Sequence, residues 1–419
     1  MKSKVAILHY SAPPVIGGVE AVMQAHAHQL QQAGYSTTII AGRGSQEHVG
    51  LDVSFIHIPE IDSQHPDILA ASSILEKGQI PTNFEDLVVQ LLNKLAPLLK
   101  NFDNLIVHNL FTKHFNLPMT AALFHLLDQN IIHGGIAWCH DFTWTSPNSR
   151  SKVYPGYPWD LLRKQHPRLS YVVVSEERQR DLANLFECPV EKINVIYNGV
   201  NPQDLLGLSS EGMELIKRLN LLDSELNILM PVRVTQAKNI EYALQVLAMV
   251  ISNGIAAKLV LTGPPDPHDA HNMAYYHSLH QMRRKLGIED RMHFVFEAGP
   301  DPEQPYQINS QVVGDLFRIS DLLFMPSHRE GFGMPVLEAG LTGIPVVSTE
   351  IPASVEIASD EVLLIKPDQD PHTTARQILE LVEGNPISRF RRKVRQDYTW
   401  EAIFSKDIEP LLHVEDDVC

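Results

Sequence analysis

The feature that most constrains this chain is a regular alternation of short apolar, β-branched runs with longer segments of helical periodicity. Parallel sheets covered by crossover helices produce this pattern, because their strands are buried on both faces. Seven runs in the first half are predicted to be strands: 5–10, 37–41, 53–58, 105–107, 135–139, 171–174 and 194–196. Six more follow: 227–231, 258–261, 293–296, 322–325, 345–347 and 362–365. The chain is therefore predicted to be an α/β protein with two sheets.

Turn-forming residues at 198–202 separate the two series of strands. We therefore predict one domain over residues 1–200 and a second over 201–385. Residues 386–419 form a helical C-terminal segment with no following strand, which could pack back on the first domain. Two stretches break the alternation: 60–83 is polar and is expected to lack regular structure, and 142–159 is a long loop crowded with aromatic residues and prolines.

A hydrophobic content of 44% over 419 residues supplies enough apolar side chains for two or three domain cores. The 34 Lys and Arg against 50 Asp and Glu give a net charge of −16, which repels phosphate backbones and argues against a nucleic-acid-binding protein. Residues 1–200 carry 15 basic and 18 acidic side chains, so any anionic partner would more readily meet this nearly neutral half.

Cysteine content and the length of apolar runs bear on location. Cys139, Cys188 and Cys419 are too few and too scattered for a disulfide framework or a zinc site, which fits a reducing cytoplasm. The first apolar run, 5–8, is too short for a signal peptide, and no stretch of about 18 apolar residues could span a membrane. A cytoplasmic protein without a transmembrane segment is expected.

Ligands of open α/β sheets bind beyond the carboxyl ends of the strands, so the loops at those ends are candidate sites. Gly17 and Gly18 follow the first predicted strand and precede a helix, where bare backbone and a helix N-terminus favour an anion. Paired glycines at such a turn are equally often structural. Arg233 and Lys238 follow the strand at 227–231 and suit a diphosphate, although a solvated basic turn explains them as well.

The most specific motif follows the strand at 322–325 and reads Ser327-His-Arg-Glu-Gly-Phe-Gly-Met-Pro-Val-Leu-Glu338. Two carboxylates, Glu330 and Glu338, bracket bare backbone amides. The carboxylates could accept hydrogen bonds from sugar hydroxyls while the amides donate to phosphate. Pro335 suits the first helical position, which places Glu338 near the first turn, where the helix dipole alone would also favour an acidic residue.

His140 stands at the end of the strand at 135–139, between Cys139 and Asp141. Side chains alternate faces along a strand, so Cys139 and His140 point apart, which disfavours a thiol–imidazole nucleophile. His140 could bind a ligand hydroxyl or be a core histidine with satisfied hydrogen bonds. The histidine-rich stretch at 267–280 is interpreted as a solvated loop and helix face, so no metal site is predicted.

With these residues assembled, the chain resembles the family-4 glycosyltransferases of the GT-B fold. The resemblance runs through both predicted domains, and its most specific part is the Glu-x7-Glu string from Glu330 to Glu338. The other matching segments are Gly17-Gly18, Arg233 with Lys238, 195–200 and 398–400. The resemblance implies two Rossmann-like domains that face each other across a cleft. It also implies hexose transfer from a nucleoside diphosphate sugar, with retention of configuration and without a metal or other cofactor.

For the second domain, the resemblance implies a donor-binding site. Arg233 and Lys238 would hold the diphosphate, and Glu338 would hold the ribose. Glu330 would contact the donor sugar near its 3-hydroxyl as a catalytic residue. Further backbone donors would come from Gly331, Phe332, Gly333 and Met334. In one departure from the family, residues 236–237 are Gln-Ala where Pro-Glu is common.

For the first domain, the resemblance implies that Gly17 and Gly18 touch the donor from across the cleft. His140 would contact the donor sugar close to the reacting carbon as the second catalytic residue. Cations and amides at the diphosphate stabilise the leaving group most in the transition state. The acceptor hydroxyl arrives on the face that the diphosphate leaves, and the leaving phosphate can take its proton, so we assign no protein general base.

The acceptor is expected to bind mainly to the first domain, because the donor contacts concentrate in the second. The loop at 142–159 follows the strand that carries His140, and Trp144 and Tyr157 offer aromatic faces on which an acceptor could stack. These aromatics could equally pack the loop onto its own domain. The near-neutral charge of residues 1–200 favours a soluble acceptor over a lipid.

Two other classes of protein share these features. A sugar-nucleotide epimerase or a phosphorylase of the same architecture uses similar phosphate loops, and a non-catalytic regulator would keep the residues that bind the sugar nucleotide. UDP-, GDP- and ADP-sugars all remain open as the donor. The sugar, the acceptor, the linkage position and the oligomeric state remain open too.

Overall fold

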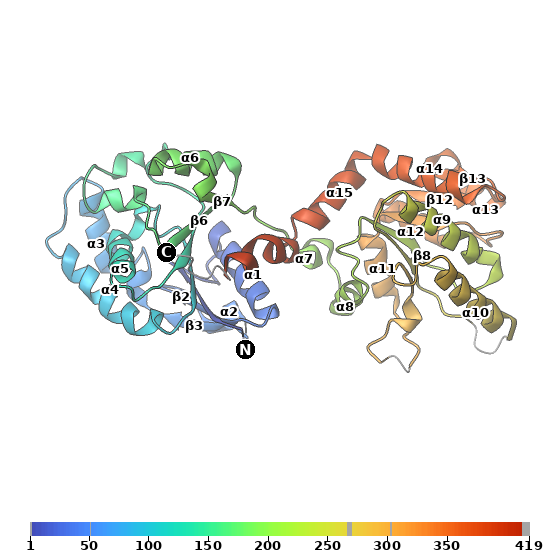
Figure 1. Ribbon diagram of the computed structural model, residues 1–419, viewed down its shortest axis with the longest axis horizontal. Helices are drawn as coiled ribbons and strands as arrows, with labels where there is room; N and C mark the ends of the chain where they lie inside the picture. Colours follow the sequence, from blue (N-terminus) through green and yellow to red (C-terminus); the bar gives the residue numbers. More distant parts are fainter. Residues whose placement is uncertain (1, 51, 266–269, 302–303, 413–419) are drawn as a thin grey trace. The chain divides into compact units, whose positions relative to one another are not determined.

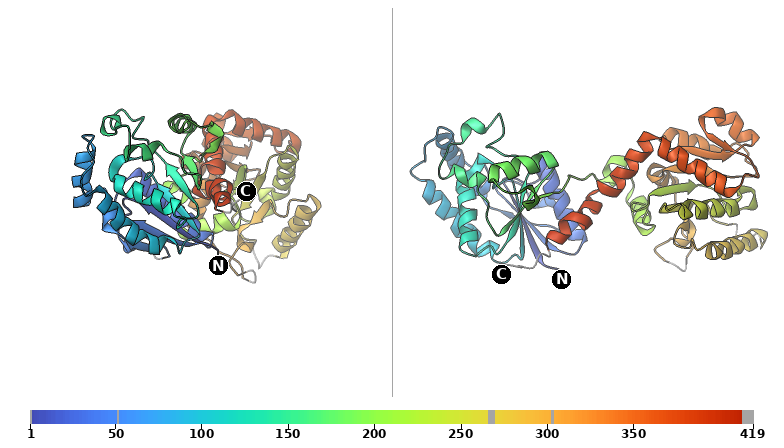
Figure 2. Two further views of the ribbon diagram at one scale, coloured as in Figure 1. Left: turned by 60° about the vertical axis from the view of Figure 1, so that its left-hand side comes forward. Right: turned by 45° about the horizontal axis from the view of Figure 1, so that its top comes forward.

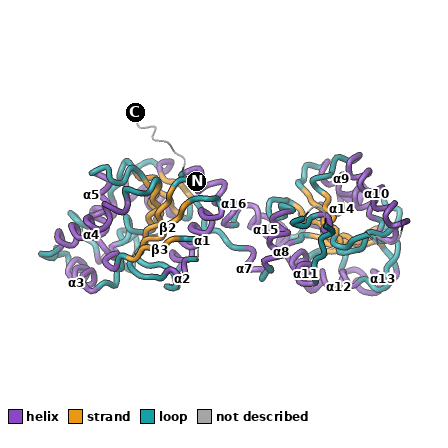
Figure 3. Tube along the Cα trace, turned by 90° about the horizontal axis from the view of Figure 1, so that it is seen from below, coloured by secondary structure: helices purple, strands orange, loops and turns teal. Residues whose placement is uncertain are grey.

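The computed structural model describes residues 2–50, 52–265, 270–301 and 304–412, and the chain divides into two compact units. Unit 1 comprises Met1–Gly199 and Trp400–Cys419, and unit 2 comprises Val200–Thr399. Each unit has a parallel sheet at its centre with helices outside it (Figure 1, Figure 3). The predicted α/β class with two Rossmann-like sheets is confirmed.

The sheet of unit 1 has seven parallel strands in the order β3-β2-β1-β4-β5-β6-β7. Their bounds are β1 (Lys4–His9), β2 (Ser36–Ala41), β3 (Ser54–His57), β4 (Asn104–His108), β5 (Gly135–Cys139), β6 (Leu169–Val173) and β7 (Ile193–Val195). Ile7 of β1 pairs with Ile39 of β2 and with Ile106 of β4. Because neighbouring strands are parallel, the carboxyl ends of β1, β4 and β5 lie together at one edge of the sheet.

Helices cover both faces of this sheet. They are α1 (Gly18–Gln32), α2 (Gln46–Val49), α3 (Pro66–Leu75), α4 (Phe84–Leu99), α5 (Leu117–Asp128), α6 (Glu176–Phe186), α16 (Trp400–Ile403) and α17 (Glu409–Leu411). Alternate residues of β1 serve the two cores: Ala6 and Leu8 pack with α4 and α5, whereas Val5 and Ile7 pack with α1. Burial on both faces explains why the strands read as continuous apolar runs.

The prediction that residues 60–83 lack regular structure is wrong, because α3 lies within them. Pro66 occupies the start of this helix, a position that needs no backbone N–H. Ile68, Ala71 and Leu75 are buried at intervals of three and four residues. A helix of ten residues has only two such intervals between its buried residues. This periodicity is too short to be recognised among the polar residues around it.

The C-terminal segment predicted at 386–419 is divided between the units. α15 (Pro386–Asp397) belongs to unit 2, whereas α16, a π-helix at Phe404–Ile408 and α17 belong to unit 1. Ile403, Phe404 and Ile408 are buried in the core beneath α1, and Figure 2 shows this dark red segment beside the first sheet. At the crossing, Val200 N donates to Tyr398 O at 2.8 Å.

The sheet of unit 2 has six parallel strands in the order β10-β9-β8-β11-β12-β13. Their bounds are β8 (Leu226–Met230), β9 (Ala257–Leu261), β10 (Met292–Phe294), β11 (Leu322–Met325), β12 (Val346–Thr349) and β13 (Leu363–Ile365). The helices before α15 are α7 (Pro202–Leu206), α8 (Ser210–Arg218), α9 (Ile240–Ser252), α10 (Ala270–Lys285), α11 (Ser310–Ile319), α12 (Met334–Thr342), α13 (Pro352–Ala358) and α14 (Pro371–Gly384). Every residue of β8, β9 and β11 is buried.

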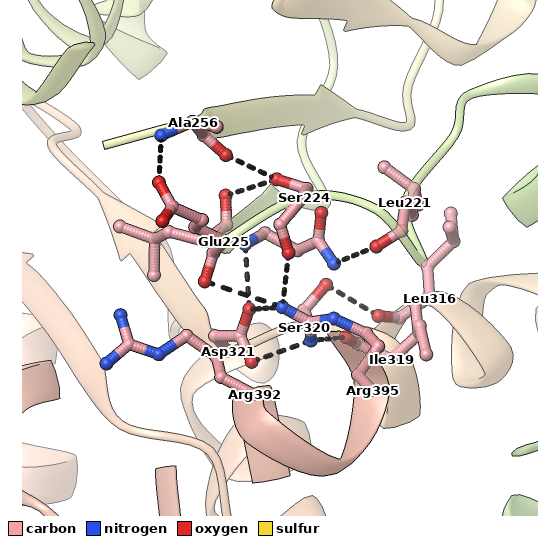
Figure 4. Close-up of polar contacts among 12 residues, drawn as sticks. Leu221, Ser224, Glu225, Ala256, Leu316, Ile319, Ser320, Asp321, Arg392 and Arg395 are labelled. Atoms are coloured by element: carbon pink, nitrogen blue, oxygen red, sulfur yellow. Dashed lines mark hydrogen bonds and ion pairs between the residues drawn. The ribbon is translucent and has the colours of Figure 1, made fainter. Parts of the chain in front are cut away.

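A buried ion pair fastens α15 to the sheet of unit 2 (Figure 4). The guanidinium of Arg395 donates to the two carboxylate oxygens of Asp321 at 2.9 and 2.8 Å, and to Ser224 O at 2.8 Å. Asp321 also accepts from Asn227 N at 2.8 Å. The side chains are only 4% and 0% exposed, so these charge-assisted bonds replace their lost hydration.

No helix in the part of the chain that the structure describes is both long and apolar enough to cross a bilayer.

Candidate active site

The loops that follow β8 and β11 lie side by side, because these strands are neighbours in the sheet of unit 2. Lys238 Nζ contacts the two carboxylate oxygens of Glu330 at 2.7 and 2.6 Å. Ser327 Oγ donates to Glu330 Oε1 at 2.6 Å. His328 N donates to Ala237 O at 2.9 Å and so ties the two loops together. The structure thus brings together two residues that the sequence predicted separately.

The backbone before α9 sets the direction of Lys238. Residues Gln236–Lys238 form one turn of 3-10 helix, and Asn239 then takes a left-handed conformation with φ 50°. Asparagine tolerates this conformation better than most residues. α9 begins at the buried Ile240, which anchors the turn. A short turn therefore forms where this sequence departs from the Pro-Glu of the family.

Lys238 and Glu330 are half-shielded from solvent, with side chains 21% and 11% exposed. An ion pair in this setting gains from reduced screening, and each partner holds the other in place. An ammonium has three donors, so Lys238 can serve Glu330 and an anionic ligand together. Glu330 can likewise accept from a ligand hydroxyl, because a carboxylate has about four acceptor positions.

Arg233 lies on the same loop and is exposed. No hydrogen bond or ion pair of its side chain is found among the described residues. Gly263, just after β9, packs against this loop: a Cβ there would lie 2.5 Å from Val232 O and 2.8 Å from Arg233 Cα. Gly263 was not among the predicted site residues, although a glycine two positions after the strand predicted at 258–261 was a usable signal.

The glycine-rich segment leads directly into α12. Gly333 has φ 97°, a left-handed conformation that glycine adopts without strain, and α12 begins at Met334. Phe332 and Met334 are more than half exposed, and Gly331 is exposed as well. The backbone at 331–334 is thus accessible to a ligand beside Glu330.

The position expected for Glu338 needs a correction. The sequence placed it near the first turn of the helix, but it is the fifth residue of α12, with Pro335 the second. The helix dipole acts mainly on the first turn, so it does not explain an acidic residue here. Glu338 is exposed. Its predicted role on the ribose remains a proposal.

In unit 1, three histidines meet where adjacent strands end. His9 ends β1, His108 ends β4, and His140 directly follows β5. His108 Nδ1 lies 3.1 Å from His140 Nε2, and His9 Nδ1 lies 3.0 Å from His108 O. Asn109, with φ 60°, accepts from His140 N at 2.9 Å and so holds the turn after β5. His140 is therefore a hydrogen-bonded, 9% exposed residue at the edge where ligands of such sheets bind.

Burial sets the protonation of this cluster. Desolvation lowers the pKa of His140 to about 4 and that of His26, which packs beside His108, to about 3. It also lowers the pKa of His108 well below 6.5. These imidazoles are neutral at pH 7. Burial raises the pKa of the Cys139 thiol to about 12, so no thiolate forms there, which agrees with the exclusion of a cysteine nucleophile.

Gly17, the first of the paired glycines, lies against a buried carboxylate. Glu20, in the first turn of α1, accepts from Ser11 Oγ at 2.5 Å and lies 3.9 Å from His9 Nε2. A Cβ on Gly17 would lie 2.2 Å from Glu20 Oε2, whereas Gly18 has open space around it. A side chain at position 17 would therefore displace the Glu20 carboxylate. Glu20 was not among the predicted site residues, although an acidic residue two positions after the glycine pair was a usable signal.

For Trp144, the contacts favour the alternative in which the aromatic residues pack the loop onto its own domain. Trp144 is 7% exposed, its Nε1 donates to Trp159 O at 3.2 Å, and the guanidinium groups of Arg150 and Arg163 lie 4.5 and 4.3 Å from its ring centre. Contacts within the loop therefore occupy this ring, because arginine stacks favourably on an aromatic face.

Tyr157 differs from Trp144, because 43% of it is exposed. Its hydroxyl donates to Glu85 Oε1 at 3.1 Å, and it lines an open cavity of about 580 Å³.

Among the described residues, no group of three or more His, Cys, Asp or Glu is arranged to hold a metal ion. Residues 266–269 of the histidine-rich stretch lie outside the described residues.

Two family models match the chain. The Glycosyltransferase Family 4 model matches residues 16–204, and the Glycosyl transferases group 1 model matches residues 213–398. The chain belongs to the family-4 glycosyltransferases. The two matched segments of this glycosyltransferase correspond closely to units 1 and 2, so the suspected family is confirmed over both sheets.

Several named proteins resemble this glycosyltransferase in sequence. An uncharacterized glycosyltransferase of Methanocaldococcus jannaschii is 25% identical over 246 residues, 57% of this chain and 58% of that protein. The O-antigen biosynthesis glycosyltransferase WclY of Escherichia coli is 27% identical over 192 residues, 44% of this chain and 45% of that protein. A D-inositol 3-phosphate glycosyltransferase of Corynebacterium glutamicum is 27% identical over 129 residues, 30% of this chain and 28% of that protein. The chain thus spans about half the length, or less, of these relatives.

Solved structures of similar chains include a glycosyltransferase from Rickettsia africae. It is 18% identical, with a TM-score of 0.37 over 98% of this chain and 97% of that chain. The Anabaena protein HepE, solved in complex with UDP, is 17% identical, with a TM-score of 0.35 over 97% of this chain and 99% of that chain.

Proposed function

We propose that this glycosyltransferase moves a hexose from a nucleoside diphosphate sugar to a hydroxyl of a soluble acceptor. We further propose that transfer retains the anomeric configuration and needs no metal. The observation that carries the proposal is the Lys238–Glu330–Ser327 network beside the exposed Arg233, on loops at the carboxyl edge of unit 2. It combines two cations, a carboxylate and accessible backbone amides in one unit.

These groups suit the two ends of a sugar nucleotide. Arg233 and Lys238 supply the positive charge that a diphosphate needs, and this charge matters most as the anomeric bond breaks and the phosphate gains charge. Glu330 is the carboxylate that would accept from sugar hydroxyls, held in orientation by Lys238 and Ser327. Glu338 would bind the ribose, in line with the family resemblance.

Retention follows in this proposal from the way in which the proton is handled. His140 is buried and neutral, and its Nε2 is already bonded to His108, so it is a poor general base. The leaving phosphate would instead take the proton of the acceptor hydroxyl that arrives on the same face. Asp141, the one carboxylate next to His140 in sequence, is exposed and is assigned no nucleophilic role.

The experiment that tests the proposal begins with the donor. Each of UDP-, GDP- and ADP-hexose is added to the purified chain, and one class is expected to raise the melting temperature, because a ligand of the native state stabilises it. That donor is then incubated with soluble hydroxyl acceptors, with and without EDTA. We expect a glycoside with the anomeric configuration of the donor and an unchanged rate in EDTA.

Matched variants locate the activity. Arg233→Ala and Lys238→Ala are expected to raise the Kd of the nucleoside diphosphate about 10- to 100-fold, because each removes a charged hydrogen bond to phosphate. Arg376→Ala, which removes an exposed arginine of α14, is the control and should change nothing. An inverted product, loss of activity in EDTA, epimerisation without acceptor, or binding without turnover would each contradict the proposal.

A further inference from the structure

The rings of His108 and His140 form a hydrogen-bonded pair at the carboxyl ends of β4 and β5 in unit 1. Their centroids lie 5.4 Å apart with planes 20° apart, and His108 Nδ1 lies 3.1 Å from His140 Nε2. Within the described residues, His140 makes its one ring hydrogen bond through Nε2, which leaves Nδ1 as the ring nitrogen that can meet a ligand. The proton between the two rings therefore decides what His140 offers at Nδ1.

Among the described residues, His108 has a hydrogen-bond partner for only one of its two ring nitrogens, Nδ1. It is fully buried, and its Nε2 has no hydrogen-bond partner among the described residues. A proton on Nε2 would be a buried donor without an acceptor, an arrangement that is rarer in proteins than an unused acceptor. A proton on Nδ1 instead donates directly to His140 Nε2. The neutral His108 therefore carries its proton on Nδ1.

We propose that His108 is a positioning residue that fixes His140 as the Nδ1–H tautomer, so that His140 presents a hydrogen-bond donor to the donor sugar. This inference rests on the proposed function for its ligand, but the tautomer itself belongs to the chain. In a neutral imidazole one nitrogen donates and the other accepts, so the bond from His108 uses the only lone pair of His140.

Side chains from α1, β1 and β5 pack around the two histidines. The ring of His26 from α1 lies 5.4 Å from that of His108, and the ring of Trp138 from β5 stacks on it at 5.9 Å. His9 and Glu20 face the cluster from β1 and α1, and Asp141 adjoins His140 in the chain. Burial keeps the histidines neutral, so none supplies a second proton to the pair.

The chemical consequence concerns the role of His140. A histidine that donates at Nδ1 can hold a sugar hydroxyl or a phosphate oxygen, but it has no free lone pair with which to accept a proton from the acceptor. His140 therefore orients the donor and does not act as the general base. This role agrees with proton transfer to the leaving phosphate. It also means that the substrate atom bound by His140 is an oxygen that accepts a hydrogen bond.

The direct test measures the tautomer. The chain is labelled with 15N-histidine, and the ring nitrogens of His140 are identified by their loss in His140→Asn. Long-range 1H–15N correlation spectra at pH 7 are expected to show a protonated Nδ1 and an unprotonated Nε2 for His140 in the unaltered chain. A protonated Nε2 on His140 would overturn the proposal, whatever the enzyme transfers.

Variants test whether His108 causes this state. His108→Leu removes the donor, so His140 should shift toward the Nε2–H form, and kcat should fall at least about tenfold. The Kd of the nucleoside diphosphate, which depends on unit 2, should stay within about twofold. His108→Asn places an amide N–H near the former Nδ1 and should restore the tautomer and most of kcat.

His26→Phe is the matched control, because it alters a buried ring of the same cluster that makes no hydrogen bond to His140. It should leave the His140 tautomer unchanged. An equal shift in His26→Phe and His108→Leu would reduce His108 to a packing residue and overturn the proposal. A chain that transfers no sugar but shows the expected tautomers would refute the proposed function and leave this inference standing.

Discussion

The two units bury polar groups in opposite ways. Near the strand ends of unit 1, burial lowers the pKa of His26, His108 and His140, so each imidazole is neutral and carries a single ring proton. In unit 2, two pairs of buried or half-buried side chains are charged: Arg395 with Asp321, and Lys238 with Glu330. The three imidazoles avoid the cost of burying charge, and the two ion pairs compensate that cost by pairing opposite charges.

This difference teaches where each unit is vulnerable. A neutral cluster tolerates the loss of one ring but is penalised when acid forces protons onto it. A buried ion pair is destabilised when one partner is removed, because an uncompensated charge remains. The contrast is consistent with the proposed function, in which charged side chains of unit 2 bind the diphosphate and neutral side chains of unit 1 contact the sugar.

The largest effect is expected from Arg395→Met, which leaves Asp321 buried without its partner. The free energy of unfolding of unit 2 should fall by about 3–5 kcal/mol. The chain has four tryptophans, and all lie in unit 1, so their fluorescence in urea follows that unit alone. The circular-dichroism transition should move to lower urea while the fluorescence transition stays. Arg376→Met is the exposed control, and equal shifts in both variants would break the comparison.

The next largest effects distinguish the roles of Glu330, in the loop after β11, and Glu338, in α12. Glu330→Gln should lower the transfer rate about 10- to 100-fold, because it removes a charged partner of Lys238 and of the sugar. Binding of the nucleoside diphosphate alone should change less. Glu338→Gln should do the reverse, which calorimetric titration with the nucleoside diphosphate can measure. Equal losses of nucleotide binding in the two variants would contradict these assignments.

Mild acid should weaken unit 1 more than unit 2. The folded pKa values of His26 and His140 lie below the unfolded value of 6.5, so the unfolded chain binds protons first as the pH falls. Stability is therefore full above pH 6.5 and declines toward pH 4, by about 2 kcal/mol per histidine at pH 5. Tryptophan-detected melts at pH 7 and pH 5 measure this loss. His26→Phe should reduce it, and an unchanged slope would refute the role of His26.

The smallest effect concerns Tyr157, which is exposed and lines the open cavity of unit 1. Tyr157→Ala should raise the KM of the acceptor a few-fold, consistent with the loss of about 1 kcal/mol of aromatic contact. Hydrolysis of the donor without acceptor should not change. Tyr157→Phe keeps the ring and loses only the bond to Glu85, so it should behave as the unaltered chain. Equal losses of transfer and hydrolysis would remove Tyr157 from the acceptor site.

The sequence predicted those parts of the molecule whose signals are local. β-branched runs located the strands, and Lys238 and Glu330 each stand in a short string just after one of them. The partner of His140 could not be found in this way, because His108 lies 32 positions earlier and becomes its neighbour only through the pairing of β4 with β5.

Packing also decided what the sequence left open. The sequence allowed Trp144 either to stack on an acceptor or to pack the loop onto its domain, and Arg150 and Arg163 lie over its ring. No local pattern reports which arginine will reach a given ring. The helix α3 was missed because its three buried residues give too short a periodic stripe. Short elements and side-chain partners depend on the assembled structure.

The chain passes between the two units twice, near residues 199–200 and near residues 399–400. Unit 2 is therefore a continuous segment inserted in unit 1. As the chain leaves the ribosome, every residue of unit 2 is present once Thr399 has been added. Unit 1 still lacks Ile403, Phe404 and Ile408, which complete the core beneath α1. Domains form as units during synthesis, so the unit that begins second is the first to be complete, and the unit that begins first must wait for residues 403–408, which are translated after all of unit 2.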